Sequence, residues 1–234
     1  MSTLTLVRHG QARPFEKDSD RLSDLGEQQA RSLGQYWIRE GIRFDAAVSG
    51  SLKRHRQTEE QVRATGFAMP HSTIDAGWNE YDAGAILQLL GPKLVAEDAL
   101  FAQRKQEFDA MEKGEDRNRY FQRMFEMLMD AWLRGRVIAD GVETFATYQA
   151  RVLAALHGIT EAAGSNRNVV VFTSGGPIGL CVQHALHAPD SAFLDVNWRM
   201  RNCSVNEFTF SKGRLSLDSL NGMSHLERQA LSWR

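Results

Sequence analysis

The segment LVRHGQA, from Leu6 to Ala12, places a charged pair directly after a short apolar run. The run Leu4–Val7 predicts a strand, and Gly10 is expected to let the backbone turn after it. In open α/β sheets, ligands bind in the crevice beyond the carboxyl ends of the strands. At such a position, Arg8 can hold phosphate oxygens in a bidentate manner, and a neutral His9 imidazole can attack phosphorus. The pair indicates phosphate chemistry, although an ordinary surface turn can contain the same two residues.

Short apolar strands alternate with helical patterns in both halves of the chain. The predicted elements are a strand at Leu4–Val7, a helix at about Leu25–Glu40 capped by Ser23 or Asp24, a strand at Ala46–Val48, a helix at about Lys53–Ala64, an extended piece at Ser72–Ile74, a helix at about Thr144–Ala163, a strand at Val169–Thr173, a helix at about Ile178–Leu186, and a hairpin of Val205–Phe210 with Leu215–Leu220. This order predicts βαβ units, and therefore an α/β fold with a parallel sheet and a hairpin at its edge.

The stretch from about 83 to 136 has helical patterns and no strand signal, which predicts a helical insertion within a single domain spanning residues 1–234. Its apolar residues recur at helical spacing and predict one broad face. They are Tyr120, Phe121, Met124, Phe125, Leu128, Met129, Trp132 and Leu133. Packing on the main domain is the preferred interpretation of this face, and a substrate lid or a dimer surface is the alternative.

Composition restricts the class of partner. With 28 Lys+Arg against 29 Asp+Glu, the formal net charge of −1 gives no electrostatic reason to expect nucleic acid or an anionic membrane as a partner. The two cysteines, Cys181 and Cys203, lack metal-ligand spacing and are expected to be free thiols. Neither a basic-then-apolar leader nor a long apolar window is present, so a cytoplasmic location is expected. The sequence predicts no cofactor and no metal, and it leaves open whether the chain forms a homo-oligomer.

A second cationic cluster follows the strand Ala46–Val48. The first turn of the next helix contains Lys53, Arg54, His55 and Arg56, where the helix dipole disfavours positive charge. An anion held at this helix N-terminus by Arg54 explains the placement, and pairing of Arg56 with Glu60 is the simpler alternative.

Six segments in fixed order extend this pattern over nearly the whole chain outside the insertion. They are LVRHGQA, RLSDLGEQQARSLGQYW, FDAAVSGSLKRHRQTEE, GWNEYDAGAI, VVVFTSGGPIG and SLNGMSHL. In this order they resemble the histidine phosphatase superfamily, the phosphoglycerate-mutase-like proteins. The resemblance implies a three-layer α/β/α sandwich around a mostly parallel sheet, with a helical insertion.

The resemblance also implies roles for individual residues. His9 matches the histidine that becomes phosphorylated, and Arg8 and Arg54 match the arginines that clamp the phosphate. Glu80 matches the acid that protonates the leaving oxygen, with Asp82 nearby but less well placed. The implied reaction is metal-independent hydrolysis of a small phosphorylated substrate.

One position departs from the family pattern. Where the family has a second histidine, this chain has Ser174, followed by Gly175 and Gly176, which resembles a subgroup with Ser-Gly-Gly. A hydroxyl is a neutral donor, and loss of one transition-state donor typically lowers the rate on the order of a hundredfold to a thousandfold. The backbone amides of both glycines can recover part of that loss. Weak turnover is therefore expected, and Ser174→His is expected to raise it if the pocket has room.

The remaining histidines and two other functions complete the sequence-based hypotheses. His55 replaces a residue that is usually small in the family, so it could reach the phosphate, although an exposed side chain is expected. His225 lies in a matching tail segment and is a minor candidate for the site. A non-catalytic phosphoester-binding or interaction protein would need Arg8 and Arg54 but neither a nucleophile nor an acid. A serine hydrolase using Ser174 with Asp218 and His225 is disfavoured, because Phe172 stands where a nucleophile elbow needs glycine.

Overall fold

A computed structural model describes residues 1–13, 19–112, 114–162 and 166–233. The chain divides into two compact units, one formed by Met1–Glu80 with Arg151–Arg234 and the other by Tyr81–Ala150. The first unit contains a six-stranded sheet with the strand order β3-β2-β4-β1-β5-β6. The strands are β1 (Ser2–Arg8), β2 (Ala46–Ser49), β3 (Ser72–Ile74), β4 (Asn168–Thr173), β5 (Val205–Ser211) and β6 (Arg214–Gly222).

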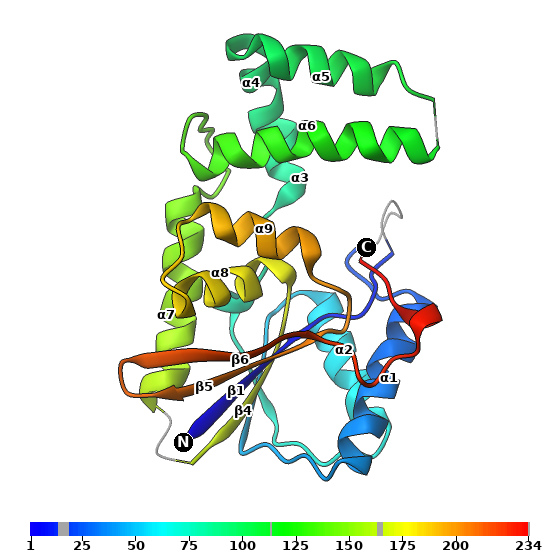
Figure 1. Ribbon diagram of the computed structural model, residues 1–234, viewed down its shortest axis with the longest axis vertical. Coiled ribbons are helices and arrows are strands. Elements are labelled where there is room, and N and C mark those ends of the chain that lie inside the picture. Colours follow the sequence, from blue (N-terminus) through cyan, green and yellow to red (C-terminus); the bar gives the residue numbers. More distant parts are fainter. Residues whose placement is uncertain (14–18, 113, 163–165, 234) are drawn as a thin grey trace. The chain divides into compact units, whose positions relative to one another are not determined.

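The sheet is mixed, as the sequence predicted. Strands β3, β2, β4 and β1 are parallel, and β5 and β6 form an antiparallel hairpin beside β1 (Figure 1). The register pairs Arg8 of β1 with Thr173 of β4. Consequently the residues that follow these two strands, His9 and Ser174, begin neighbouring loops at one edge of the sheet.

Helices cover both faces of the sheet. Helices α1 (Asp24–Arg39) and α2 (Lys53–Ala64) share a buried core with one face, built from residues such as Trp37, Val62 and Phe172. The opposite face is covered by α8 (Gly175–Ala185), with α9 (Ser191–Arg199) packed on it, and by the part of α7 (Phe145–Ala162) that lies beside β2 and β3 (Figure 1). This arrangement confirms the predicted three-layer α/β/α sandwich.

One helix boundary and one additional helix differ from the predictions, whereas the cap of α1 agrees with them. Ser23 caps α1 by accepting a hydrogen bond from the Gly26 amide. Helix α8 begins at Gly175 rather than near Ile178. Its proline lies in the first turn, where a missing N–H removes no hydrogen bond within the helix. Helix α9 was not predicted. Its nine residues bury only Phe193 and Leu194, so the apolar period is weak.

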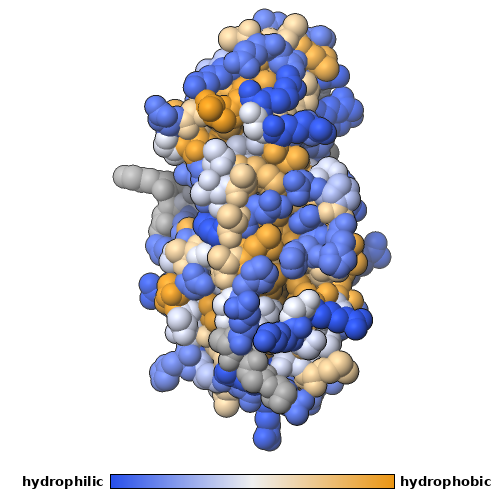
Figure 2. All heavy atoms as spheres, turned by 90° about the vertical axis from the view of Figure 1, so that its left-hand side faces the viewer, coloured by the Kyte–Doolittle hydropathy of each residue, from blue (hydrophilic) through white to orange (hydrophobic). Residues whose placement is uncertain are grey.

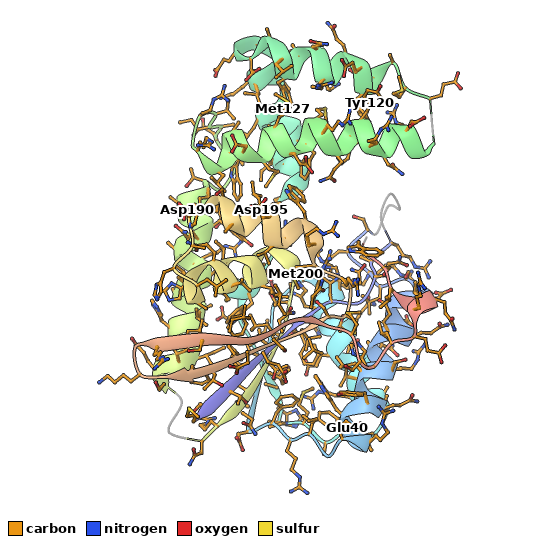
Figure 3. The ribbon with its side chains drawn as sticks, in the orientation of Figure 1. Glu40, Tyr120, Met127, Asp190, Asp195 and Met200 are labelled. Atoms are coloured by element: carbon orange, nitrogen blue, oxygen red, sulfur yellow. The ribbon has the colours of Figure 1, made fainter. Side chains whose placement is uncertain are left out.

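Every regular element among the described residues of the second unit is helical, and turns and irregular segments connect them. It contains α3 (Ala83–Ala85), a π-helical turn (Ile86–Leu90), α4 (Gly91–Glu97), α5 (Ala99–Asp109) and α6 (Glu115–Leu133), the last of which contains the labelled Tyr120 and Met127 (Figure 3). Its core includes Trp132, whose ring lies 5.3 Å from Tyr81, 5.4 Å from Phe145 and 5.8 Å from Tyr148, measured between centroids. The predicted apolar face of α6 is therefore a packing surface inside this unit.

The surface is mixed in polarity (Figure 2), and the two cysteines are free thiols as their number and spacing predicted. Hydrophilic and hydrophobic side chains are mixed on the face drawn in Figure 2. Among the described helices, none combines the length and apolar character needed to cross a membrane. Cys181 and Cys203 are both free and buried, and burial raises the pKa of each thiol.

Candidate active site

His9 follows β1 directly, and its backbone is fixed by neighbours on both sides. Its amide donates to the Thr173 carbonyl at 2.9 Å, and its carbonyl accepts from the Cys203 amide at 3.0 Å. In the side chain, Nδ1 lies 2.7 Å from the Gly10 carbonyl oxygen. Because a carbonyl can only accept, Nδ1 carries the proton and Nε2 retains its lone pair.

The surroundings of His9 keep the ring neutral. Burial lowers its pKa well below 6.5, and the positive charges of Arg54 and Arg8 lower it further, against a smaller opposing effect of the Gly10 hydrogen bond. Both guanidinium groups therefore lie within electrostatic range of His9. A neutral imidazole with an available Nε2 lone pair is the form that acts as a nucleophile.

Gly10 has a different role from the one expected. It is absent from the glycines with positive φ, so the turn itself does not require glycine. A Cβ at Gly10 would lie 2.4 Å from the carbonyl oxygen of Gly26 in α1. Close packing of the loop against α1 therefore excludes a side chain at this position.

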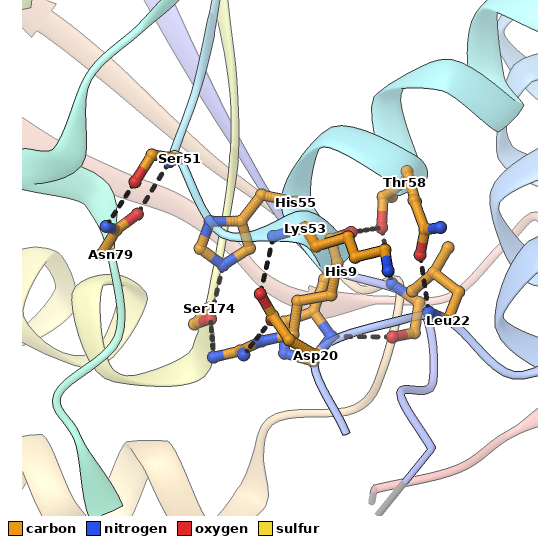
Figure 4. A network of polar contacts seen from close by, with 12 residues as sticks. His9, Asp20, Leu22, Ser51, Lys53, His55, Thr58, Asn79 and Ser174 are labelled. Carbon is orange, nitrogen blue, oxygen red and sulfur yellow. Dashed lines mark hydrogen bonds and ion pairs between the residues drawn. The ribbon is translucent and has the colours of Figure 1, made fainter. Parts of the chain in front are cut away.

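Arg54, from the first turn of α2, contacts both a carboxylate and a hydroxyl. Its Nη1 lies 2.6 Å from Asp20 Oδ1, and its Nη2 donates to Ser174 Oγ at 3.4 Å (Figure 4). The other carboxylate oxygen of Asp20 accepts the Lys53 amide at 2.8 Å. The anion predicted at this helix N-terminus is thus supplied, in this structure, by Asp20 of the chain itself.

His55 is buried, which corrects the prediction of an exposed side chain. Its Nε2 lies 2.6 Å from Ser174 Oγ, and its ring centroid is 5.8 Å from that of His9 (Figure 4). The buried face of α2 consists of His55, Thr58, Glu59 and Val62, which is a helical spacing of i, i+3, i+4, i+7. That periodicity is the sequence signal that identifies His55 as an inward-facing residue.

Arg8 and Gly175 lie beside each other at the ends of β1 and β4. A Cβ at Gly175 would be 3.7 Å from Arg8 Nε and only 2.5 Å from Asn197 Oδ1. Arg8 Nη1 also donates to the carbonyl of Met200, which is labelled at the end of α9 in Figure 3. The guanidinium is therefore held against the loop that follows α9.

The side chain of Glu80, which precedes α3 in the sequence, contacts the first turn of α8. Its Oε2 accepts the Gly176 amide at 3.0 Å, so this amide, expected to serve a ligand, is engaged by Glu80. Arg151 of α7 donates to the carbonyls of Gly77 and Asn79 at 3.0 and 2.9 Å, and to that of Glu80 at 3.4 Å, and thereby fixes the preceding segment. Asp82 instead caps α3 by accepting the Ala85 amide.

The structure does not form the serine-hydrolase triad. The histidine that contacts Ser174 is His55 rather than His225, and Asp218 accepts a hydrogen bond from Thr209. Asp20 and Arg151 were not identified from the sequence, because their contacts join distant segments without a local motif. Across the described residues, no three His, Cys, Asp or Glu side chains are grouped to hold a metal ion.

A six-stranded mixed sheet flanked by helices, with His9 and Ser174 following adjacent parallel strands, defines an α/β protein whose candidate site lies at the carboxyl ends of those strands. The family model "Histidine phosphatase superfamily (branch 1)" matches residues 4–136 and 122–222, so the chain belongs to this superfamily.

Similar proteins include one curated sequence and several solved structures. The chain is 34% identical over 95 residues to the broad-specificity phosphatase YOR283W of Saccharomyces cerevisiae, a match that covers 38% of each protein. The structure of YhfR from Bacillus stearothermophilus has a TM-score of 0.66 at 21% identity, covering 97% of this chain and 100% of that one. A putative alpha-ribazole-5′-P phosphatase from Escherichia coli has a TM-score of 0.65 at 18% identity, covering 95% and 98%. At these identities the structural matches establish the fold.

Proposed function

We propose that this protein is a phosphomonoesterase that hydrolyses a small phosphorylated substrate through a phosphohistidine at His9. The observation that carries the proposal is the state of His9, a neutral ring whose Nδ1–H is bound to the Gly10 carbonyl and whose Nε2 is available. Two of the similar proteins are named as phosphatases, which supports the same class of reaction.

In the first step, His9 Nε2 attacks phosphorus in line as the bond from phosphorus to the leaving oxygen breaks. Arg8 and Arg54 offset the negative charge of the phosphoryl oxygens, and Ser174 and Gly175 contribute neutral donors. Glu80 gives its proton to the leaving oxygen.

In the second step, water attacks the phosphohistidine, the bond between phosphorus and Nε2 breaks, and the water proton passes to Glu80. This step releases inorganic phosphate and restores the neutral His9. The steps assigned here use protein side chains and water only, so we propose that activity is independent of added metal.

The decisive experiment measures phosphate release from a panel of phosphomonoesters, with and without EDTA, by the wild-type protein and His9→Ala. We expect hydrolysis by the wild type in EDTA and none above background by folded His9→Ala. Binding of phosphoesters without turnover by the wild type would instead identify a non-catalytic phosphoester-binding protein. Equal activity of both proteins would exclude the phosphohistidine mechanism.

A further inference from the structure

His55 is a buried imidazole to which the proposed reaction assigns no role. It comes from α2, one residue after Arg54, and its ring lies beside that of His9 while its Nε2 contacts Ser174 Oγ at 2.6 Å. A Cβ at Gly50 would lie 2.2 Å from His55 Nδ1, so the backbone of the preceding loop lies directly against the ring. A buried histidine packed this closely has little room to move, and its contact with Ser174 orients the ring.

The hydrogen bonds of the ring determine which nitrogen carries its proton. Burial and the charge of Arg54 lower the pKa of His55 well below 6.5, so the ring is neutral and has a single N–H. Nδ1 has no hydrogen-bond partner among the described residues. Because buried N–H groups without an acceptor are rarer than unsatisfied acceptors, the proton is expected on Nε2, which then donates to Ser174 Oγ.

This assignment fixes the hydroxyl of Ser174 as well. A serine oxygen has two acceptor lone pairs and one O–H. His55 Nε2 and Arg54 Nη2 both donate to this oxygen, which leaves the O–H as its remaining hydrogen-bonding group. Ser174 does not use its side chain to cap α8, although it precedes that helix directly. The O–H is therefore directed away from both donors and needs an acceptor.

We propose that His55 is a positioning residue: it orients the Ser174 hydroxyl so that the O–H donates to the phosphoryl group transferred to His9. This inference rests on the proposed function. In the family pattern, an imidazole follows β4 directly. Here the serine at that position is instead supported by an imidazole from α2. Without His55, the hydroxyl can rotate, and its donor is no longer held toward the phosphoryl group.

Two substitutions of similar polarity separate orientation from packing. In His55→Gln, the side-chain amide nitrogen can occupy the position of Nε2 and still donate to Ser174 Oγ, whereas the shorter chain of His55→Asn cannot reach it. For p-nitrophenyl phosphate, we expect His55→Asn to lower kcat about tenfold with little change in KM, as for loss of one hydrogen bond. We expect His55→Gln to recover most of that loss, and exposed His71→Asn is the matched control.

A double-mutant cycle tests whether His55 acts through Ser174. In a Ser174→Ala background, His55→Asn is expected to cause no further loss, because the hydroxyl that it positions is absent. Wild-type kcat in folded His55→Asn would overturn the proposal. Equal losses in both backgrounds would also overturn it, since His55 would then act independently of Ser174.

A spectroscopic measurement tests the same proposal without relying on turnover. The ¹⁵N chemical shifts of the His55 ring distinguish a proton on Nε2 from one on Nδ1, and we expect the Nε2–H form. A ring protonated on Nδ1 would overturn the proposal even in an active enzyme. If His9→Ala left hydrolysis intact, the phosphohistidine mechanism would fail, whereas a His55 result alone would leave that mechanism standing.

Discussion

The ends of β1 and β4 are neighbours in the sheet but are built differently. The end of β1 supplies its own imidazole, His9, held by the adjacent Gly10 carbonyl. The end of β4 supplies only the hydroxyl of Ser174, and the imidazole beside it comes from α2. The comparison shows that a strand-end motif in the sequence identifies only some of the groups at the sheet edge, because others come from neighbouring helices.

Apart from loss of His9 itself, removing the group that contacts both ends should have the largest effect. Arg54 lowers the pKa of His9 and contacts Ser174, so Arg54→Gln should lower kcat/KM for phosphomonoesters on the order of a hundredfold to a thousandfold. Arg54→Lys should recover little, because an ammonium cannot reproduce the planar fork. Exposed Arg56→Gln, on the same helix turn, is the matched control and should retain wild-type kinetics.

Exchanging the imidazole between α2 and β4 tests the comparison directly. Ser174 is fully buried against His55, so the room that Ser174→His needs is already filled, and the single substitution should lower activity. The double variant His55→Ala/Ser174→His vacates that room. It should be about tenfold more active than Ser174→His, as expected when one donor is restored. Steady-state kinetics on p-nitrophenyl phosphate decides the matter, and a double variant no better than Ser174→His would refute the exchange.

The partly buried imidazole of His225 should make stability near the β1 end sensitive to acid. Burial lowers the pKa of His225 from 6.5 to about 4, against the raising effect of its hydrogen bond with the Cys203 backbone. The unfolded chain therefore binds this proton at a higher pH than the native state does. The free energy of unfolding should fall as the pH drops from 6.5 to about 4, by at most about 3 kcal/mol from this residue.

Denaturant unfolding at several pH values measures this contribution. His225→Gln should flatten the decline between pH 6.5 and about 4, whereas exposed His71→Gln should leave its slope unchanged. Parallel pH profiles of the wild type and His225→Gln would contradict the prediction. The comparison uses slopes, so a general loss of stability in His225→Gln does not affect it.

The smallest expected effect is a shift in the pH profile of kcat/KM. Since the pKa of His9 is lowered, the nucleophile should stay neutral and active below pH 6.5. Arg8→Gln removes one of the positive charges that disfavour protonation, so the pKa of His9 should rise and the acid limb should move to higher pH. An unchanged or lower acid limb in Arg8→Gln would show that another group controls it.

Residues next to a strand end were the most predictable part of the site. His9 and Ser174 were located because apolar runs mark β1 and β4, and parallel strands deliver their following residues to one edge. His55 was predicted to be exposed, as the more common state of a histidine on a helix, although its spacing to Thr58 and Val62 indicates the buried face. A polar residue on a buried helix face is therefore identified from its helical spacing to other buried residues rather than from the polarity of its side chain.

Contacts between distant segments could not be predicted. Asp20 lies in a stretch rich in aspartate, and nothing local distinguishes the carboxylate that reaches Arg54 from its neighbours. Arg151 is one of many arginines, and its contacts with the carbonyls of Gly77 and Asn79 depend on where α7 lies beside β2 and β3. The parallel sheet and its edge hairpin follow from βαβ patterning, whereas the order of the strands and such long-range polar contacts require coordinates.

The ion pair between Asp20 and Arg54 bears on how readily inorganic phosphate leaves after each cycle. A guanidinium without a counterion would hold the departing dianion firmly, and release would then limit turnover. Asp20 forms an ion pair with Arg54, and in the proposed mechanism its carboxylate would offset part of that charge and repel a phosphate bound by Arg54. We therefore expect the ion pair between Asp20 and Arg54 to re-form when phosphate leaves, so that free phosphate is a weak inhibitor.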